Sequence, residues 1–281
     1  MSANGLVHMH RRGPTLSDPT PVIALHCSGS GAGQWRALGA SLAARHGLVA
    51  PEHYGCESVG PWTGTHAFTL ADEAARTIEA IDRSDWKVHL VGHSYGGAVA
   101  LHAAIERPGR VASLTLYEPT AFHLLKTMGE RGMPALAEIR AIAARTAQGV
   151  ITGNYRGAAV AFVDYWSGPG TWATLRPAVQ QSMTRWMPKA PLDFRALIDE
   201  PTRTSRLAAL RFPMLILRGE HAPLPTRLIA EALKASMPSA RLQIVAGAGH
   251  MGPITHAKDV NLAILRQIGE AEAWADLAIP A

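Results

Sequence analysis

One stretch of the sequence, from Val88 to Ala100, limits the possible folds more than any other. An apolar segment ends at Gly92, and Ser94 then stands between two glycines in the order Gly-x-Ser-x-Gly. Small residues recur after Gly96 at helical spacing. This pattern is typical of a tight strand–turn–helix connection, in which side chains at the glycine positions would collide and the serine hydroxyl stands clear of the sheet. We therefore predict that Ser94 is a nucleophile, since an ordinary strand-to-helix turn needs no glycine on both sides.

Strand-like and helix-like segments alternate through the first 118 residues. Short apolar runs, typical of buried parallel strands, are followed by segments with helical periodicity. The expected strands are 22–25, 48–50, 86–91 and 111–117, the expected helices are 34–45, 70–82 and 95–107, and a weak alternation over 6–12 predicts an edge strand. This order predicts an α/β fold with a doubly wound, mostly parallel sheet.

The periodicity is almost entirely helical from residue 119 to about residue 206. The helices expected there are 134–148, 155–166, 172–187 and 192–198. Strands at 213–218 and 242–245 and helices at 226–235 and 257–273 then restore the alternation. We therefore expect a core domain made of residues 1–118 and 207–281, with residues 119–206 inserted as a helical cap over the carboxyl edge of the sheet.

Composition excludes several classes of protein. The chain has 281 residues, 47% of them apolar, which is enough for one large domain or a core with an insert. The net charge of +5 comes mostly from scattered arginines, so we expect no nucleic-acid partner. Cys27 and Cys56 make no disulfide framework and are expected to be reduced. Residues 1–14 lack the apolar region of a secretion signal, and no apolar stretch reaches the length of a membrane span. We therefore predict a cytoplasmic protein without a membrane partner, as a monomer or homodimer.

A serine hydroxyl is a poor nucleophile until a base takes its proton, and His250 is the predicted base. The chain has thirteen histidines, so position has to identify the base. His250 alone combines a late position, a preceding strand at 242–245 and a loop of small residues. The alternative interpretation is a surface loop histidine.

Two preorganised donors are needed to stabilise an oxyanion. One is expected to be the backbone N–H of Tyr95, which directly follows the nucleophile. The other is expected to be the N–H of Ser28, in the loop after the strand at 22–25. Phosphate binding is the alternative for this glycine-rich loop, but the loop fits neither the P-loop nor the dinucleotide-binding pattern.

The chain resembles capped, single-domain enzymes of the α/β-hydrolase fold. The matching segments are 25–30 (Leu-His-Cys-Ser-Gly-Ser), 92–97 (Gly-His-Ser-Tyr-Gly-Gly) and 247–250 (Gly-Ala-Gly-His), and their order and spacing agree over essentially the whole chain. Two features depart from the family. His26-Cys27 replaces the usual His-Gly, and the family's acid is missing from its usual place, where this chain has Ala222, three residues after Gly219.

The third member of a triad must therefore be found elsewhere. Glu118 follows the strand at 111–117, and the resemblance supports it because some family members, haloalkane dehalogenases among them, place their acid after that strand. Glu220, directly after Gly219, is the alternative. A third interpretation is that Glu118 only bonds loop amides where the cap begins. We favour Glu118, because a triad needs a carboxylate directed at Nδ1 of the imidazole.

Four residues are expected to line the substrate pocket: His26, Phe122, Trp166 and Met251. An apolar cap over a buried serine favours a small, uncharged, partly apolar substrate such as an ester. The resulting hypothesis is a serine hydrolase that cleaves carboxylic esters through an acyl-enzyme, without a metal or organic cofactor. The alternatives are a binding protein that keeps the fold without turnover, and a lactone, amide or C–C bond hydrolase or lyase with the same triad.

Overall fold

The structure is a computed structural model, and it describes residues 20–277. The edge strand expected at 6–12 lies outside the described residues. Six strands form one sheet in the order β2-β1-β3-β4-β5-β6, and all neighbouring strands are parallel. The strands are β1 (Val22–Leu25), β2 (Leu48–Val49), β3 (Val88–His93), β4 (Val111–Tyr117), β5 (Met214–Gly219) and β6 (Ala240–Val245). The predicted α/β class with a parallel sheet is confirmed.

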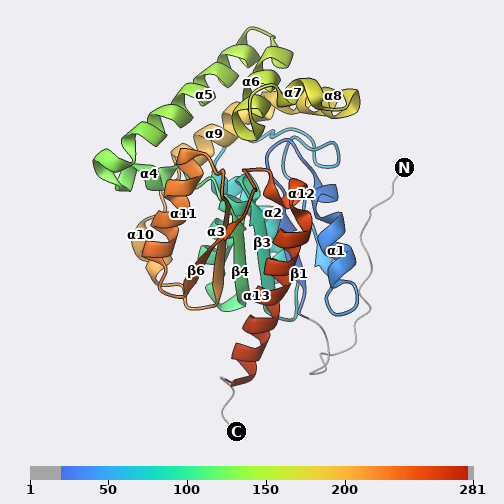
Figure 1. Cartoon of the computed structure of the whole chain (residues 1–281), viewed down its shortest axis with the longest axis vertical. Helices are drawn as coiled ribbons and strands as arrows, with labels where there is room; N and C mark the ends of the chain where they lie inside the picture. Colours follow the sequence, from blue (N-terminus) through green and yellow to red (C-terminus); the bar gives the residue numbers. More distant parts are fainter. Residues whose placement is uncertain (1–19, 278–281) are drawn as a thin grey trace.

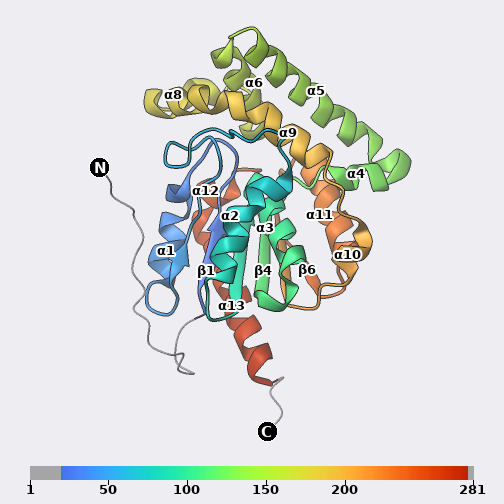
Figure 2. The same ribbon diagram turned by 180° about the vertical axis from the view of Figure 1, so that it is seen from behind.

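Helices cover both faces of this sheet. The helices outside the segment between β4 and β5 are α1 (Arg36–Leu42, preceded by a 3-10 turn at Ala32–Trp35), α2 (Leu70–Asp82), α3 (Tyr95–Glu106), α11 (Leu224–Ser236), α12 (Gly252–Thr255) and α13 (Ala257–Leu277). Helices α1 and α13 lie on the face seen in Figure 1, and α2 and α3 lie on the opposite face, seen in Figure 2. The sequence predicts the bounds of α2 to the residue, because Thr69 caps its first turn through the amide of Asp72.

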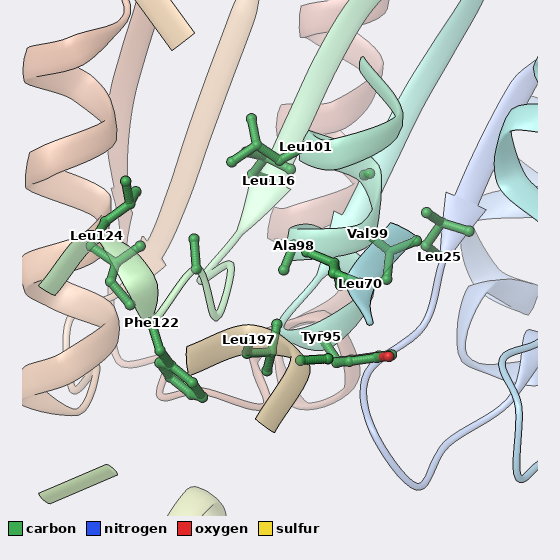
Figure 3. Close-up of a cluster of buried hydrophobic side chains, with 14 of the residues drawn as sticks. Leu25, Leu70, Tyr95, Ala98, Val99, Leu101, Leu116, Phe122, Leu124 and Leu197 are labelled. Atoms are coloured by element: carbon green, nitrogen blue, oxygen red, sulfur yellow. The ribbon is translucent and has the colours of Figure 1, made fainter. Parts of the chain in front are cut away.

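Alternating side chains of the strands belong to two separate hydrophobic clusters, which is why both faces bind helices. In β1, Ile23 and Leu25 pack with α2 and α3, whereas Val22 and Ala24 pack with α1 and α13. The larger cluster extends beyond the sheet to the helices that follow β4 (Figure 3). Leu197 is one of its labelled members there. The core and the helical segment therefore share buried apolar surface.

The segment between β4 and β5 is helical, as predicted. It contains α4 (His123–Thr127), α5 (Met133–Ile151), α6 (Tyr155–Ser167), α7 (Thr171–Thr174), α8 (Pro177–Trp186), α9 (Ala190–Ile198) and α10 (Thr204–Ala208), with short 3-10 turns at Gly129–Arg131 and Met187–Lys189. Helices α5–α9 lie across one end of the sheet (Figure 1). We call α5–α9, with the 3-10 turn at Met187–Lys189, the cap helices.

The single helix expected at 172–187 is broken in two. Leu175 and Arg176 separate α7 from α8, and both have a ψ of 143°. The following Pro177 causes this break, because the proline ring disfavours helical geometry in the residue before it. The helices α4, α10 and α12 were not expected, since four or five residues are too few to show a helical period. Within residues 20–277, no helix combines the length and the apolar character that crossing a membrane requires.

Candidate active site

Ser94 occupies a sharp turn between β3 and α3. Its φ of 55° and ψ of −118° lie in a region that residues with a side chain rarely adopt. The turn is so tight that it excludes side chains at both glycines. A Cβ on Gly92 would lie 2.5 Å from the carbonyl oxygen of Gly96, and one on Gly96 would lie 2.4 Å from that of His26. The Gly-x-Ser-x-Gly pattern thus has a steric cause. Backbone strain of this kind costs on the order of 1–3 kcal/mol and is concentrated at functional sites.

The imidazole of His250 lies beside this serine. Its Nε2 is 2.9 Å from Oγ of Ser94, and its ring centroid is 4.4 Å from that of Trp166 in α6. Two side chains of the core hold the loop that carries it. His93 donates from Nε2 to the carbonyl oxygen of His250 at 2.8 Å, and Tyr117 donates to that of Gly249 at 2.7 Å. The ring is therefore fixed between the serine and the cap helices.

Glu118 lies on the other side of the same ring. Its Oε2 is 2.7 Å from Nδ1 of His250. The amide of Gly219 donates to Oε1, and the hydroxyl of Thr226 donates to Oε2, both at 2.8 Å. The carboxylate is fully buried, and its residue has a positive φ of 42°. Of the interpretations that the sequence left open, this geometry brings Glu118 to the imidazole, with the amide of Gly219 at the end of β5 as an additional partner.

Glu220 points elsewhere. It is exposed, and its Oε2 accepts a hydrogen bond from the amide of Gly247 at 2.8 Å. It therefore stabilises the turn that precedes His250 and has no hydrogen bond to that ring. The small side chain of Ala222 leaves the family's usual acid position without a carboxylate.

Ser28 and Tyr95 carry the backbone amides expected to form the oxyanion hole. Ser28 follows β1, and Tyr95 is the first residue of α3, where helical N–H groups lack intrahelical acceptors. Among residues 20–277, neither amide has a hydrogen-bond acceptor. Each is free to donate to a bound oxygen, and the helix dipole at Tyr95 favours negative charge there.

A cavity of about 600 Å³ opens above Ser94 and His250. Three of the four residues predicted to line it do so, namely Phe122, Trp166 and Met251. Apolar side chains of α6, α8 and α9 make up much of the remaining wall, among them Phe162, Val163, Met183, Trp186, Phe194 and Leu197. The loop after β1, α7 and α12 complete the wall, and Asp193 of α9 is one of its polar residues. Such a wall suits an apolar ligand with a few polar groups.

His26 was the fourth residue predicted to line the pocket, and this prediction is wrong. The cavity wall includes Cys27, Ser28, Gly29 and Ser30 of the loop after β1, but not His26. Its Nδ1 donates to the carbonyl oxygen of Cys27 at 2.8 Å, and its Nε2 faces the amide of His53 at 3.4 Å. Burial, with a contribution from nearby His53, lowers the pKa of His26 to about 3. The ring is thus a neutral structural group.

Both cysteines are free, as expected. Burial raises the pKa of the Cys27 thiol to about 12 and that of Cys56 to about 11. Cys56 lies beside the loop after β1, with Sγ 3.5 Å from the carbonyl oxygen of Ser30. Because the thiolate is the reactive form, neither thiol is a nucleophile at neutral pH.

Two groups of polar residues around the site were not predicted. In the first, Gln34 accepts from the amide of Cys27 and donates to Nδ1 of His93, each at 3.1 Å, which connects the loop after β1 to the backbone of His250. The second is a buried cluster of Glu73, Lys189 and Asp193. Neither group was predictable from a sequence pattern, because the partners come from distant segments.

No group of three His, Cys, Asp or Glu side chains among residues 20–277 is arranged to hold a metal ion.

Sequence comparison finds related segments in proteins named as hydrolases. The putative carbamate hydrolase RutD of Azorhizobium caulinodans is 36% identical over 98 residues, which are 34% of this chain and 36% of that protein. Lipase LipV of Mycobacterium tuberculosis is 34% identical over 114 residues, or 40% of this chain and 41% of the lipase. The matched segments thus span well under half of the length of these relatives.

Similarity to solved structures extends over most of the chain. A hydrolase from Pseudomonas aeruginosa superposes with a TM-score of 0.69 at 22% identity, covering 89% of this chain and 90% of that one. The carboxylesterase CesB of Bacillus subtilis gives a TM-score of 0.63 at 20% identity, covering 88% and 83%. At these identities the likeness concerns the fold. The model of the alpha/beta hydrolase family matches residues 22–263, so the chain belongs to that family.

Proposed function

We propose that the protein is a serine hydrolase that cleaves carboxylic esters through an acyl-enzyme. The observation that carries this proposal is the continuous chain from Ser94 Oγ through both nitrogens of His250 to Glu118 Oε2, with distances of 2.9 Å and 2.7 Å. A serine hydroxyl, an imidazole and an orienting carboxylate in this order are the arrangement that activates a nucleophile on several unrelated folds. Membership of a hydrolase family supports the same reaction class.

The proposed reaction has two steps. Ser94 attacks the ester carbonyl carbon, and Nε2 of His250 takes the hydroxyl proton. The carbonyl oxygen becomes an oxyanion, to which the amides of Ser28 and Tyr95 donate. His250 then protonates the departing alcohol, and the acyl group stays on Ser94. A water molecule, deprotonated by the same nitrogen, attacks the acyl-enzyme and releases the acid. Glu118 holds the ring in the correct tautomer and stabilises the imidazolium.

The cavity wall supports an uncharged, partly apolar substrate. Its aromatic and aliphatic side chains offer dispersion and hydrophobic contacts, and its volume of about 600 Å³ is in the range of small-molecule sites. We also propose residues 119–206 as the inserted cap, which contributes most of this wall. The end of that segment falls inside α10, at Thr204–Ala208.

The direct test is hydrolysis of p-nitrophenyl esters of increasing acyl length by the wild type and by Ser94→Ala. We expect turnover by the wild type, with an acyl length that is preferred because it fills the cavity, and none above background by the variant. A folded wild type that cleaves none of these esters would contradict the proposal. It would favour either a ligand-binding homologue or activity on lactones, amides or C–C bonds, which product analysis separates.

A further inference from the structure

A buried charge cluster lies directly behind the two residues of the proposed oxyanion hole. At its centre is the ammonium group of Lys189, whose side chain is 5% exposed. Its Nζ lies 2.7 Å from Oε2 of Glu73 and 3.4 Å from the hydroxyl of Tyr95, and it also pairs with Oδ1 of Asp193. It further lies 4.3 Å above the ring of Phe68. The proposed mechanism gives no role to these charges, although burying them is costly.

The side chains of both oxyanion residues end on this cluster. The hydroxyl of Ser28 donates to Oδ2 of Asp193 at 3.0 Å, and the hydroxyl of Tyr95 donates to Oε2 of Glu73 at 2.8 Å. The two residues are far apart in the sequence and follow different strands. Lys189 joins the two carboxylates, so one ammonium group connects the supports of both amides.

The charges in the cluster hold one another in place. Burial opposes the charge of Lys189, but Asp193 and Glu73 outweigh it and raise the pKa of the ammonium. Glu73 also accepts a hydrogen bond from the amide of Tyr54 at 3.0 Å, and the ring of His53 lies 3.6 Å from the same oxygen. Burial raises the pKa of Asp193, whose hydrogen-bond partners are Lys189 and Ser28. Asp193 therefore depends on these two contacts for its charge.

Both sides of the molecule contribute to the cluster. Lys189 and Asp193 belong to the cap helices, whereas Glu73 is in α2 of the core. The cap helices also contact the loop after β1 at a second point. Gly29 has a positive φ of 70°, and a Cβ there would lie 2.4 Å from Sδ of Met183 and 3.2 Å from the ring of Trp186. The loop that carries the Ser28 amide is therefore fixed from the cap side at two points.

We propose that Lys189 and Asp193 are positioning residues that set the geometry of the oxyanion hole, so that the hole is complete only when the cap helices are seated on the core. The inference rests on the proposed function. The cap would then do more than enclose the substrate, because its closure would also align the two amides. A carboxylate that acts through Ser28 affects the transition state, in which the oxyanion is formed, more than it affects ground-state binding.

The test compares Asp193→Asn, Ser28→Ala and the double variant in ester hydrolysis. Removing an oxyanion donor outright lowers kcat by about 10²–10³-fold, so misplacing one is expected to lower it about 10–100-fold with little change in KM. The double variant is expected to lose no more than Asp193→Asn alone, because both substitutions break the same connection. Asp199→Asn, at the exposed residue directly after α9, is the matched control and should keep wild-type kcat.

Inhibition separates positioning from a general structural effect. A trifluoromethyl ketone forms a hemiketal oxyanion with the serine, so its Ki should rise by the same factor by which kcat/KM falls. The Ki of an apolar competitive inhibitor that forms no oxyanion should stay unchanged. If Asp193→Asn does not fold, Ser28→Ala, which keeps the backbone amide, gives the same comparison alone.

Three results would overturn the inference. One is a raised KM with unchanged kcat, which would mean that Asp193 contacts the substrate. Another is a pair of effects that multiply in the double variant, and the third is wild-type kcat in all variants. A wild type that cleaves no ester would instead overturn the proposed function, and this inference with it.

Discussion

The two halves of the proposed site are held by different parts of the chain. The hydrogen bonds that fix the serine, the histidine and the glutamate come from the core, through residues such as His93, Gly219 and Thr226. The side chains behind the two oxyanion amides instead reach Lys189 and Asp193 of the cap helices. In the proposed site, the hydrogen bonds of the nucleophile, base and acid thus come from outside the cap helices, whereas the side chain of Ser28 is held by Asp193 of the cap and that of Tyr95 is shared between Glu73 of α2 and Lys189.

The largest effect is expected at the nucleophile, in the half that the core holds. Ser94→Ala should lower kcat by about 10⁵–10⁶-fold, because the substituted residue has no atom that can form the acyl-enzyme. The binding of an apolar competitive inhibitor should be unchanged, since the cavity wall is intact. Titration of such an inhibitor by isothermal calorimetry is the control. A variant that retained ester turnover would place the nucleophile at another residue.

The next largest effect is expected at the acid. Glu118→Gln should lower kcat by about 10⁴-fold, because an amide cannot stabilise the imidazolium and favours the wrong tautomer. Glu220→Gln is the matched control, because this exposed side chain bonds only the amide of Gly247. Steady-state kinetics on one ester compares the two variants. If Glu220→Gln lowered kcat and Glu118→Gln did not, the triad acid would be Glu220, after β5, and not Glu118, after β4.

A stability measurement probes the other half of the comparison. Lys189→Met should lower the free energy of unfolding by about 3–5 kcal/mol, because it leaves Glu73 and Asp193 buried together without their cation. Lys234→Met, on the exposed side of α11, should change it by less than about 0.5 kcal/mol. Urea denaturation followed by circular dichroism gives both values. Equal stability of the two variants would mean that the cluster does not hold the cap on the core.

A smaller effect on the free energy of unfolding is expected from low pH, at another contact between the cap and the core. His123 is buried, and both of its ring nitrogens lack a partner among the described residues, with Glu200, His102 and Lys126 as the charged groups around it. Burial lowers its pKa to about 4, below the unfolded value of about 6.5. The stability that depends on the neutral ring is thus complete above the unfolded pKa and declines as pH falls through 6.5 towards 4.

Between about pH 7.5 and about pH 5, this histidine should therefore remove about 1–2 kcal/mol of stability. His123→Leu should flatten that dependence by the same amount, because the apolar side chain has no charge to acquire. Urea unfolding at the two pH values measures the difference between the wild type and the variant. An unchanged slope in His123→Leu would show that other groups cause the acid sensitivity.

Local patterns made most of the fold predictable. The strand β1 and the helix α2 have the predicted bounds, because an apolar run and a capped amphipathic segment are signals contained within a few residues. The Gly-x-Ser-x-Gly turn is predictable for the same reason, since its glycines are required by contacts inside the turn. The break before Pro177 also has a local cause, because a proline disfavours helical geometry in the residue before it.

Contacts between distant segments were not predictable. The expectation for His26 failed because its neighbours in sequence say nothing of His53, which occupies the space beneath the loop. Lys189 lies in a proline-rich stretch that separates two expected helices, and its partner Glu73 is 116 residues away. Glu118 and Glu220 each follow a strand, and the contact that distinguishes them, between Glu118 and His250, joins residues 132 positions apart.

The measurement that tests the central claim most directly is covalent labelling by a fluorophosphonate, followed by intact-mass analysis and peptide mapping. The account predicts one adduct per chain on Ser94, no adduct in Ser94→Ala, and much slower labelling in Glu118→Gln than in Glu220→Gln. Folded wild-type protein that takes up no label, or a label carried by any other residue, would contradict it.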